Sequence, residues 1–124
     1  MMKTLLLYEK DSLIKNPKYQ VLKDRAGEYY FRLCARNGEI ILTGKAHENK
    51  KYCFDAINSL KLKGDFNFIE KNDGERKLYF FHLAQDDGSI IGSSEMYSTK
   101  IGRGNGIMSV MKIICDAPTE DMTF

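Results

Sequence analysis

The fold is decided by a stretch of sequence that occurs twice. Residues 29–41 read YYFRLCARNGEII, and residues 79–91 read YFFHLAQDDGSII. The copies lie 50 positions apart, and residues 29–61 share nine identities with residues 79–111 over 33 aligned pairs. Random sequences of ordinary composition would share about two. Because the spacing stays constant throughout, the chain is predicted to contain an internal duplication.

Each copy has the pattern of a β-hairpin. The first half alternates with a period of two, which predicts a half-buried strand. In the first copy one face would carry Tyr29, Phe31, Leu33 and Ala35, and the other Tyr30, Arg32, Cys34 and Arg36. The pairs Asn37-Gly38 and Asp87-Gly88 predict type I′ turns, since both residues of each pair tolerate a positive φ. Further strands are expected after the turns at 39–43 and 89–94, and before the hairpins at 19–23 and 66–71.

The apolar period changes to 3.6 after each hairpin, which predicts an amphipathic helix. The expected apolar stripes are Cys53, Ala56, Ile57 and Leu60 in the first copy, and Ile107, Val110, Met111 and Ile114 in the second. Asn49 and Thr99 stand where N-cap residues are expected. The predicted fold class is therefore α+β, with two tandem β-β-β-α repeats forming a pseudo-dimer. Its expected parts are an N-terminal extension at 1–17, repeats at 18–64 and 65–118, and a C-terminal tail at 119–124.

A set of short motifs in the second copy points to a known family. The motifs are Phe81-His82-Leu83, Asp87-Gly88, IGSSEMYS at 91–98, NGIMSV at 105–110, and Asp116-Ala117-Pro118. Together they resemble the YegP-like family of small tandem-repeat proteins. The first copy departs from the family pattern, with His47 in place of Tyr and Asp55-Ala56 in place of Asn-Gly. The resemblance implies β-β-β-α units arranged as a pseudo-dimer over roughly residues 19–118, and it implies no activity and no catalytic residues.

The overall composition is that of an ordinary globular protein. The chain is 43% hydrophobic and 29% charged, far from a disordered composition. The apolar run at 4–8 is too short for a secretory signal or a membrane helix, so a cytoplasmic location is expected. Within it, Leu5-Leu6-Leu7 is expected to add a strand or to cover part of the sheet. The three cysteines are widely spaced, which predicts reduced thiols and no metal site.

Three local features have both a functional and a structural interpretation. Residues 102–106 (GRGNG) fit neither the dinucleotide fingerprint nor the P-loop, so we expect Gly106 to let the helix approach the sheet, with an anion site at the helix N-terminus as the alternative. Cys34 lies two residues from Arg32 and Arg36, where positive charge would favour a reactive thiolate, although an ordinary thiol is expected. His82 has no catalytic partner at a recognisable spacing, and a surface or interface role is expected.

The sequence as a whole predicts a small non-enzymatic binding or interaction module. Its binding surface is expected in the groove between the repeats or on the outer strand face, which would carry Tyr30, Phe80 and Ile41 or Ile91. The net charge is +5 over residues 1–62 and −3 over residues 63–124. This asymmetry is too weak to establish a nucleic-acid partner. A weak nucleic-acid or anion binder using the basic first repeat, and a thiol-based stress or redox protein acting through Cys34, are the alternatives.

The residues expected to bind a ligand are basic side chains around the strands and the helix starts: Arg32, Arg36, Lys50, Lys51, Lys100 and Arg103. No catalytic residue, cofactor or metal is expected. The expected partner is an unidentified protein, with no membrane association. A duplication of this kind replaces a dimer of single units, so the chain is expected to be a monomer with internal pseudo-two-fold symmetry.

Overall fold

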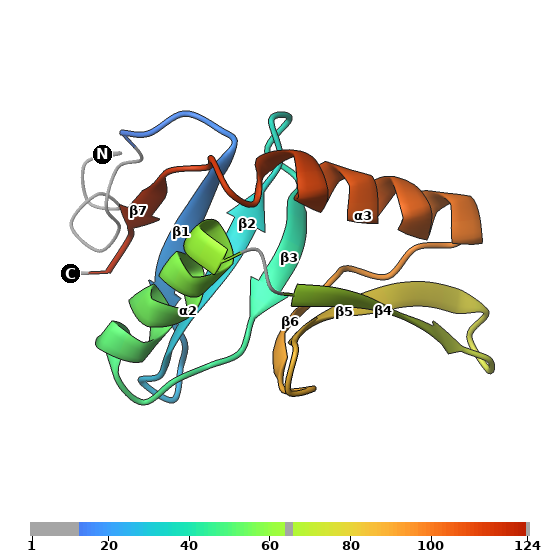
Figure 1. Cartoon of the computed structure of the whole chain (residues 1–124), viewed down its shortest axis with the longest axis horizontal. Helices are drawn as coiled ribbons and strands as arrows, with labels where there is room; N and C mark the ends of the chain where they lie inside the picture. Colours follow the sequence, from blue (N-terminus) through green and yellow to red (C-terminus); the bar gives the residue numbers. More distant parts are fainter. Residues whose placement is uncertain (1–12, 64–65, 124) are drawn as a thin grey trace, which may run out of the picture.

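A computed structural model describes residues 13–63 and 66–123, which form one seven-stranded sheet and two helices (Figure 1). In chain order the elements are β1 (Lys18–Lys23), β2 (Tyr29–Cys34), β3 (Ile40–Gly44), α2 (Lys50–Lys63), β4 (Phe66–Asp73), β5 (Leu78–Gln85), β6 (Ile90–Ser93), α3 (Lys100–Ile113) and β7 (Thr119–Asp121). The predicted α+β class and the two β-β-β-α repeats are confirmed. Neither helix has the length and apolar content that would let it cross a membrane, and the same holds for the rest of the described chain.

The sheet joins the two repeats edge to edge. Its strand order is β4-β5-β6-β3-β2-β1-β7, and every neighbouring pair is antiparallel except β1 and β7. The repeats meet where β3 pairs with β6, at Thr43 opposite Ser93 and Gly44 opposite Gly92. A Cβ on Gly92 would lie 2.7 Å from the Thr43 carbonyl oxygen, so this junction has no room for a side chain. The pseudo-two-fold axis passes between these two central strands.

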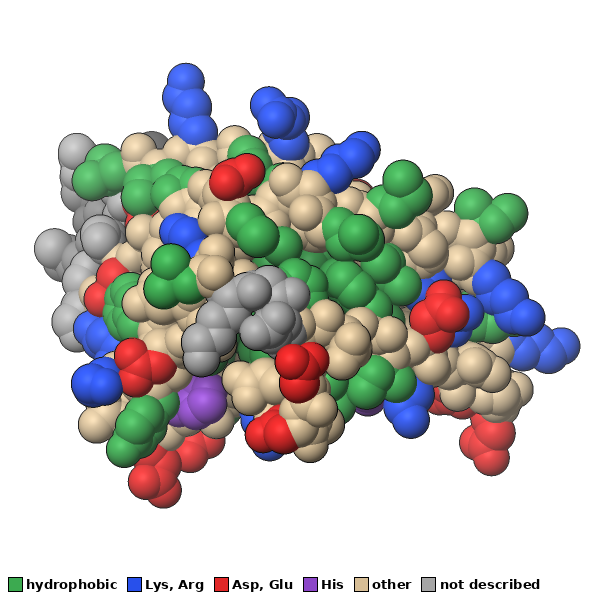
Figure 2. All heavy atoms as spheres, viewed as in Figure 1, with side chains coloured by type: hydrophobic (Ala, Val, Ile, Leu, Met, Phe, Trp, Pro, Cys, Tyr) green, Lys and Arg blue, Asp and Glu red, His purple; other side chains and the backbone are tan. Residues whose placement is uncertain are grey.

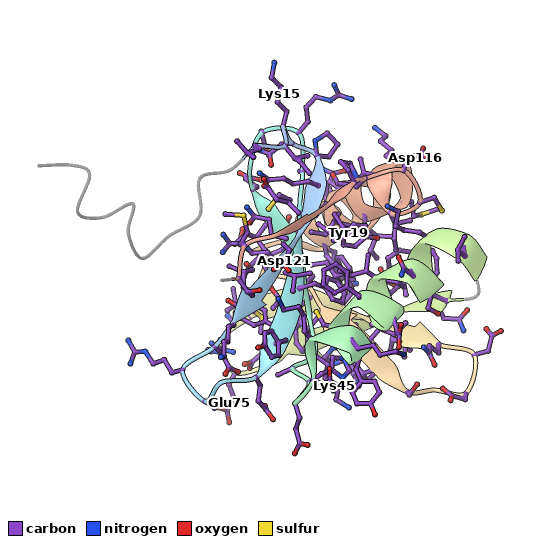
Figure 3. The ribbon with its side chains drawn as sticks, turned by 90° about the vertical axis from the view of Figure 1, so that its left-hand side faces the viewer. Lys15, Tyr19, Lys45, Glu75, Asp116 and Asp121 are labelled. Carbon is purple, nitrogen blue, oxygen red and sulfur yellow. The ribbon has the colours of Figure 1, made fainter. Side chains whose placement is uncertain are left out.

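Both helices cover the same face of the sheet, as Figure 3 shows from the side. One hydrophobic core lies beneath them and confirms the predicted alternation of the strands and the stripe of α2. Its most buried members are Tyr19, Val21, Phe31, Leu33, Leu42, Phe81 and Leu83 from the sheet, Cys53, Ile57 and Leu60 from α2, and Val110 and Ile114 from the end of α3. Full burial of each large apolar side chain contributes roughly 1.5–3 kcal/mol. The sheet therefore has one covered face, and its other face carries no helix among the described residues.

The N-terminal ends of both helices are capped as predicted. The Thr99 side chain accepts a hydrogen bond from the Gly102 N–H at 2.9 Å, and the Asn49 side chain accepts one from the Lys51 N–H at 3.0 Å. The predicted stripe of α3 is wrong at Met111, which is 59% exposed. The buried face of α3 instead follows Arg103, Gly106 and Val110, because the Arg103 guanidinium finds polar partners beside the sheet.

The hairpin turns differ from the predicted type I′ geometry. Gly38 has a φ of 88° and Gly88 has the same φ, but neither Asn37 nor Asp87 has a positive φ. The Gly38 N–H donates to the Ala35 carbonyl at 2.9 Å, and the Ala35 N–H donates to the Glu39 carbonyl at 2.8 Å. This is a type I turn followed by a glycine bulge, in which only the glycine must adopt a positive φ.

A shift in strand register changes the direction of two isoleucines. Leu33 pairs with Leu42 while Cys34 pairs with Ile40, so Ile41 has no partner on β2. The second repeat has the same shift, which leaves Ile91 unpaired. Both side chains belong to the core cluster, because a bulge turns two successive residues toward one face. The expectation that Ile41 or Ile91 lies on the outer strand face is therefore wrong.

The predicted tail at 119–124 contains a strand. β7 pairs in parallel with β1, and Glu120 forms an ion pair with Lys18 at 2.9 Å; both side chains are less than a tenth exposed. The Leu13 and Ile14 N–H groups also donate to the Glu120 carboxylate, at 2.6 and 3.1 Å. A buried pair of this kind needs such additional hydrogen bonds to offset desolvation. The role expected for Leu5-Leu6-Leu7 lies outside the described residues.

Candidate functional site

The sheet face opposite the helices presents a row of polar side chains, and we call it the outer face. Strand register places one such residue of each strand beside the next, in the order Gln20, Arg32, Thr43, Ser93 and His82. Arg32 and His82 are equivalent by the 50-residue repeat, and so are Thr43 and Ser93. Each repeat therefore contributes equivalent positions to the row, and the pseudo-two-fold axis passes through its centre.

Hydrogen bonds hold both ends of this row. The Arg32 Nε donates to the Gln20 Oε1 at 2.7 Å. The His82 Nδ1 and the Ser93 Oγ lie 2.6 Å apart, with the direction of donation set by the imidazole tautomer. A guanidinium has five N–H donors and a hydroxyl has one. Gln20 is buried at 7% exposure, and the rest of the row combines a fixed positive charge with neutral donors on a partly exposed surface.

Two aromatic rings flank the row at opposite corners. Tyr30 lies two residues before Arg32, and Phe80 lies two residues before His82. β2 and β5 are antiparallel, since three successive antiparallel pairings separate them, so the two rings extend from the row in opposite directions. Strand spacing of about 4.8 Å and a rise of about 3.4 Å per residue put the rings roughly 20 Å apart. Both rings are half-buried, and the Phe80 ring meets His82 edge-on at 5.4 Å.

The outer face has a positive balance of charge. By strand register, its two carboxylates belong to Glu120 and Asp73. Glu120 pairs with Lys18, and Asp73 with Arg76 at 2.7 Å. The Arg76 partner holds the pKa of Asp73 below its ordinary value, so that carboxylate stays ionised and paired near neutral pH. The cations of Arg32 and Lys71 then have no carboxylate opposing them on this face of the described sheet.

The basic residues expected to bind a ligand do not form one cluster. Arg32 lies in the polar row, and Arg36 lies at the first hairpin tip. Lys50 and Lys51 lie at the start of α2, on the helix-bearing side, and Lys100 begins α3. The Lys50 Nζ contacts the Asp121 carboxylate at 3.1 Å, and the Lys51 Nζ contacts the Asp55 carboxylate at 3.0 Å. Of these side chains, only that of Arg32 belongs to the outer face.

Arg103 is a structural residue, contrary to the expected binding role. It is only 7% exposed, and its Nη1 donates to the Lys71 carbonyl at 2.8 Å. Its guanidinium also lies over the Tyr79 ring, 5.5 Å from the centroid, and its Nε lies 3.4 Å from the Glu70 carboxylate. These contacts attach α3 to the edge strand β4. A ligand could reach this guanidinium only by breaking them.

Cys34 lacks the environment of a reactive thiolate. The side chain is 5% exposed, and its Sγ lies 3.6 Å from the Gln20 Oε1. Burial raises the pKa of the Cys34 thiol, and this effect exceeds the opposing influence of Arg32 and Lys18. The positive charge noted in the sequence is present, but desolvation outweighs it. Burial and the raised pKa therefore favour the ordinary thiol that the sequence predicts over a redox role through Cys34.

Hydrophobic side chains gather below α3 on the face that Figure 2 shows. Two hollows lie beside the hairpins on the helix-bearing side. The larger has a volume of about 400 Å³ and lies between the first hairpin and the end of α3, lined by Arg36, Asn37, Glu39, Ser109 and Lys112 among others. The smaller, of about 230 Å³, is lined by Lys45, His47, Ala56, Gln85 and Ser89 with two isoleucines.

The smaller hollow includes two positions at which the repeats differ. His47 and Ala56 line it, whereas the equivalent positions in the second repeat are Tyr97 and Gly106. A Cβ on Gly106 would overlap the Tyr97 hydroxyl and lie 2.6 Å from its Cζ. Gly106 was expected to let the helix approach the sheet, but the group that it admits is the Tyr97 ring from the segment before α3. A smaller ring at position 47 accommodates an alanine at 56.

Sequence reasoning identified Arg32 but not the row that contains it. Thr43 and Ser93 lie within the predicted strands at 39–43 and 89–94, and the sequence indicates no partner for His82. The contact between His82 and Ser93 depends on the pairing register of β5 and β6, which the spacing of residues along the sequence does not reveal. The available signal was the repeat itself, because positions 50 apart must occupy equivalent places in a two-fold arrangement. No group of three His, Cys, Asp or Glu in the described chain is arranged to hold a metal ion.

Comparison with known proteins agrees with this fold. The model of a domain of unknown function, DUF1508, matches residues 24–65 and 76–121. A UPF0339 protein of Bordetella pertussis is 38% identical over 109 residues, covering 85% of this chain and 96% of that protein. The solution structure of YegP from E. coli has a TM-score of 0.75 at 27% identity, covering 89% of this chain and 96% of that one. A UPF0339 protein of Shewanella oneidensis has a TM-score of 0.74 at 30% identity, covering 84% and 89%.

Proposed function

The chain belongs to the DUF1508 family, and on that premise we propose that it is a small non-enzymatic binding module whose ligand lies on the outer face. One observation carries the proposal: both repeats contribute equivalent positions to a polar row on the sheet face that bears no helix in the described chain. Polar side chains are usual on an uncovered face of an antiparallel sheet, so the support lies in the two-fold placement of the row and in its unopposed Arg32 charge.

Binding is favoured over catalysis by the composition of the row. Ser93 and His82 resemble a nucleophile and its general base. A catalytic site also needs a group that orients the imidazole and donors aimed at a developing charge. The neighbours in the row are Thr43 and Arg32, which are donors suited to holding an anionic or polar ligand. The row is therefore interpreted as a binding surface.

The proposal includes the oligomeric state of the functional protein. The β3–β6 junction already gives one chain the continuous sheet that a dimer of single units would form, so we take the monomer as the active form. The cysteines of the described chain are free, which suits the reducing conditions of the cytoplasm. Light scattering that gave twice the mass of 14.3 kDa at all concentrations would contradict the monomer.

Retrieval of ligands from the protein's own cells tests the proposed function. The tagged full chain would be purified at low salt, and bound protein, nucleic acid and small molecules identified. The double variant Tyr30→Ala/Phe80→Ala alters the outer face, and Tyr52→Ala removes an exposed ring from α2 as a matched control. A ligand that the wild type and Tyr52→Ala retain, and that the double variant loses, supports the proposal. A ligand that the double variant retains at full occupancy refutes it.

A further inference from the structure

We propose that the ligand of the outer face is single-stranded nucleic acid, an inference that rests on the binding function proposed above. Proteins that hold single strands combine a positively charged path for the backbone with aromatic rings on which bases stack. The outer face has both elements on one continuous sheet. The proposal concerns the described residues of the face and needs no movement of the two helices.

The aromatic element is the pair Tyr30 and Phe80. Each residue is only partly buried, so part of its surface is accessible to a base. The edge-on contact with His82 at 5.4 Å helps to fix the Phe80 ring. Because the rings lie at opposite corners of the row, a strand that stacks on both must cross the row diagonally. The roughly 20 Å between them suits a segment of several nucleotides.

The polar row would hold the phosphates of that segment. Arg32 supplies a guanidinium at one end, whose planar donors match phosphate oxygens. Thr43 and Ser93 add hydroxyl donors along the diagonal path. Lys71 on β4 pairs with Phe80 on β5 and adds a cation beside that ring. The two carboxylates of this face, on Glu120 and Asp73, are occupied by ion pairs and do not oppose an approaching phosphate.

Charge also favours this occupant over a second copy of the chain. Two outer faces packed together would place one positively charged surface against another. Like charges brought together at an interface oppose association. A polyanion carries the charge that this face lacks. Duplex nucleic acid is disfavoured because its bases are already stacked and cannot cover the two rings.

Fluorescence anisotropy with a labelled oligothymidylate of about 12 nucleotides provides the test, repeated with oligouridylate and with a duplex of equal length. We expect binding of single strands at about 50 mM salt, with affinity that falls as salt rises. Tyr30→Ala and Phe80→Ala should each weaken binding at least about five-fold, the lower bound expected for loss of one stacked base. Tyr52→Ala, which alters an exposed ring on α2, should leave the affinity unchanged.

The charged positions give a second and independent measurement. Arg32→Gln and Lys71→Gln should each reduce the slope of log affinity against log salt by about 0.7, the contribution of one phosphate contact with a single strand. Lys51→Gln removes one positive charge from the helix-bearing side and should leave the slope unchanged. These variants keep the test valid if an aromatic variant does not fold, because the side chains of Arg32 and Lys71 lie outside the core cluster.

Three results would overturn the proposal. They are no anisotropy change at about 100 µM protein and low salt, tighter binding of the duplex than of the single strand, and equal weakening by the outer-face and control variants. If oligonucleotides fail while the double variant still loses a cellular protein, the ligand class is wrong and the outer-face function stands. If that variant also keeps its cellular ligand, both proposals fail.

Discussion

Replacement of Gly106 by alanine tests the coupling between α3 and the loop before it. Alanine is a better helix former than glycine by about 0.5–1 kcal/mol. At Gly104, where an added Cβ has nothing within 4 Å, Gly104→Ala should stabilise the protein by about that amount. At Gly106 the added Cβ would overlap the Tyr97 side chain. Overpacking of this kind costs about 1–3 kcal/mol, so Gly106→Ala should be net destabilising by about 0.5–2 kcal/mol.

The ring of Tyr97 cannot move aside without cost. It lies parallel to the Phe81 ring, at 6.5 Å between centroids and 9° between planes. Its backbone exchanges two hydrogen bonds with Tyr79, at 2.7 and 2.8 Å. The first repeat shows the arrangement that relieves the overlap, with His47 beside Ala56. In a Tyr97→His background the cost of Gly106→Ala should therefore fall by about 1–2 kcal/mol, which a double-mutant cycle measures.

Urea unfolding followed by circular dichroism is the assay, since the chain has no tryptophan for fluorescence. With a slope of about 1–3 kcal/mol per molar urea, a change of 1 kcal/mol moves the midpoint by roughly 0.3–1 M. The reasoning is refuted if Gly106→Ala is as stable as Gly104→Ala. It is also refuted if the cost of Gly106→Ala is the same with histidine at 97, because the overlap would then not be its cause.

Further predictions concern the buried arginine, the thiols and one surface carboxyl. Arg103→Ala should lower the free energy of unfolding by about 1–3 kcal/mol, because the β4 carbonyl that it caps loses its donor; an unchanged urea midpoint would contradict this role. A thiol reagent at about pH 8 should label the exposed Cys115 rapidly and Cys34 only on unfolding; equal rates in the native protein would contradict the raised pKa of Cys34. Burial raises the pKa of Asp121, but hydrogen bonds and the ion pair with Lys50 outweigh it and hold the pKa below its ordinary value. Such a carboxyl adds stability above its unfolded pKa of about 3.9 and loses it as pH falls through the folded pKa. Asp121→Asn should therefore destabilise the protein at neutral pH, and the difference in urea midpoint should shrink as the pH is lowered through the folded pKa.

The parts of the fold that sequence predicted correctly are those fixed by local periodicity. Alternation in β2 and β5 and the 3.6-residue stripe of α2 depend on neighbours within a few residues, and the repeat supplied each pattern twice. β7 escaped detection because Thr119-Glu120-Asp121 has neither alternation nor high strand propensity. Its pairing depends on β1, about 100 residues away in sequence. The ion pair with Lys18 further stabilises this contact.

The candidate site was only partly predictable, because register decides which side chains meet. A bulge of one residue reversed the expected direction of Ile41, and no local signal marks where such a bulge falls. Arg103 is predicted from its charge and its place near a helix start to bind a ligand, yet it lies on the buried face of α3 at a helical spacing from Gly106 and Val110. Arg32 and His82 can be assigned to one row only when the pairing of β2, β3, β6 and β5 is known.

The two edges of the sheet are protected from further strand pairing in different ways. At one edge of the sheet, β7 pairs with β1 and covers it. At the opposite edge, β4 has exposed Glu70 and Lys71. Charged residues on an edge strand discourage pairing with another sheet. Were the repeats separate identical chains, every mutation would alter both edges at once. Joining them in one gene lets selection cover one edge with extra chain and charge the other, so the duplicated protein can evolve an asymmetry that a symmetric pair cannot.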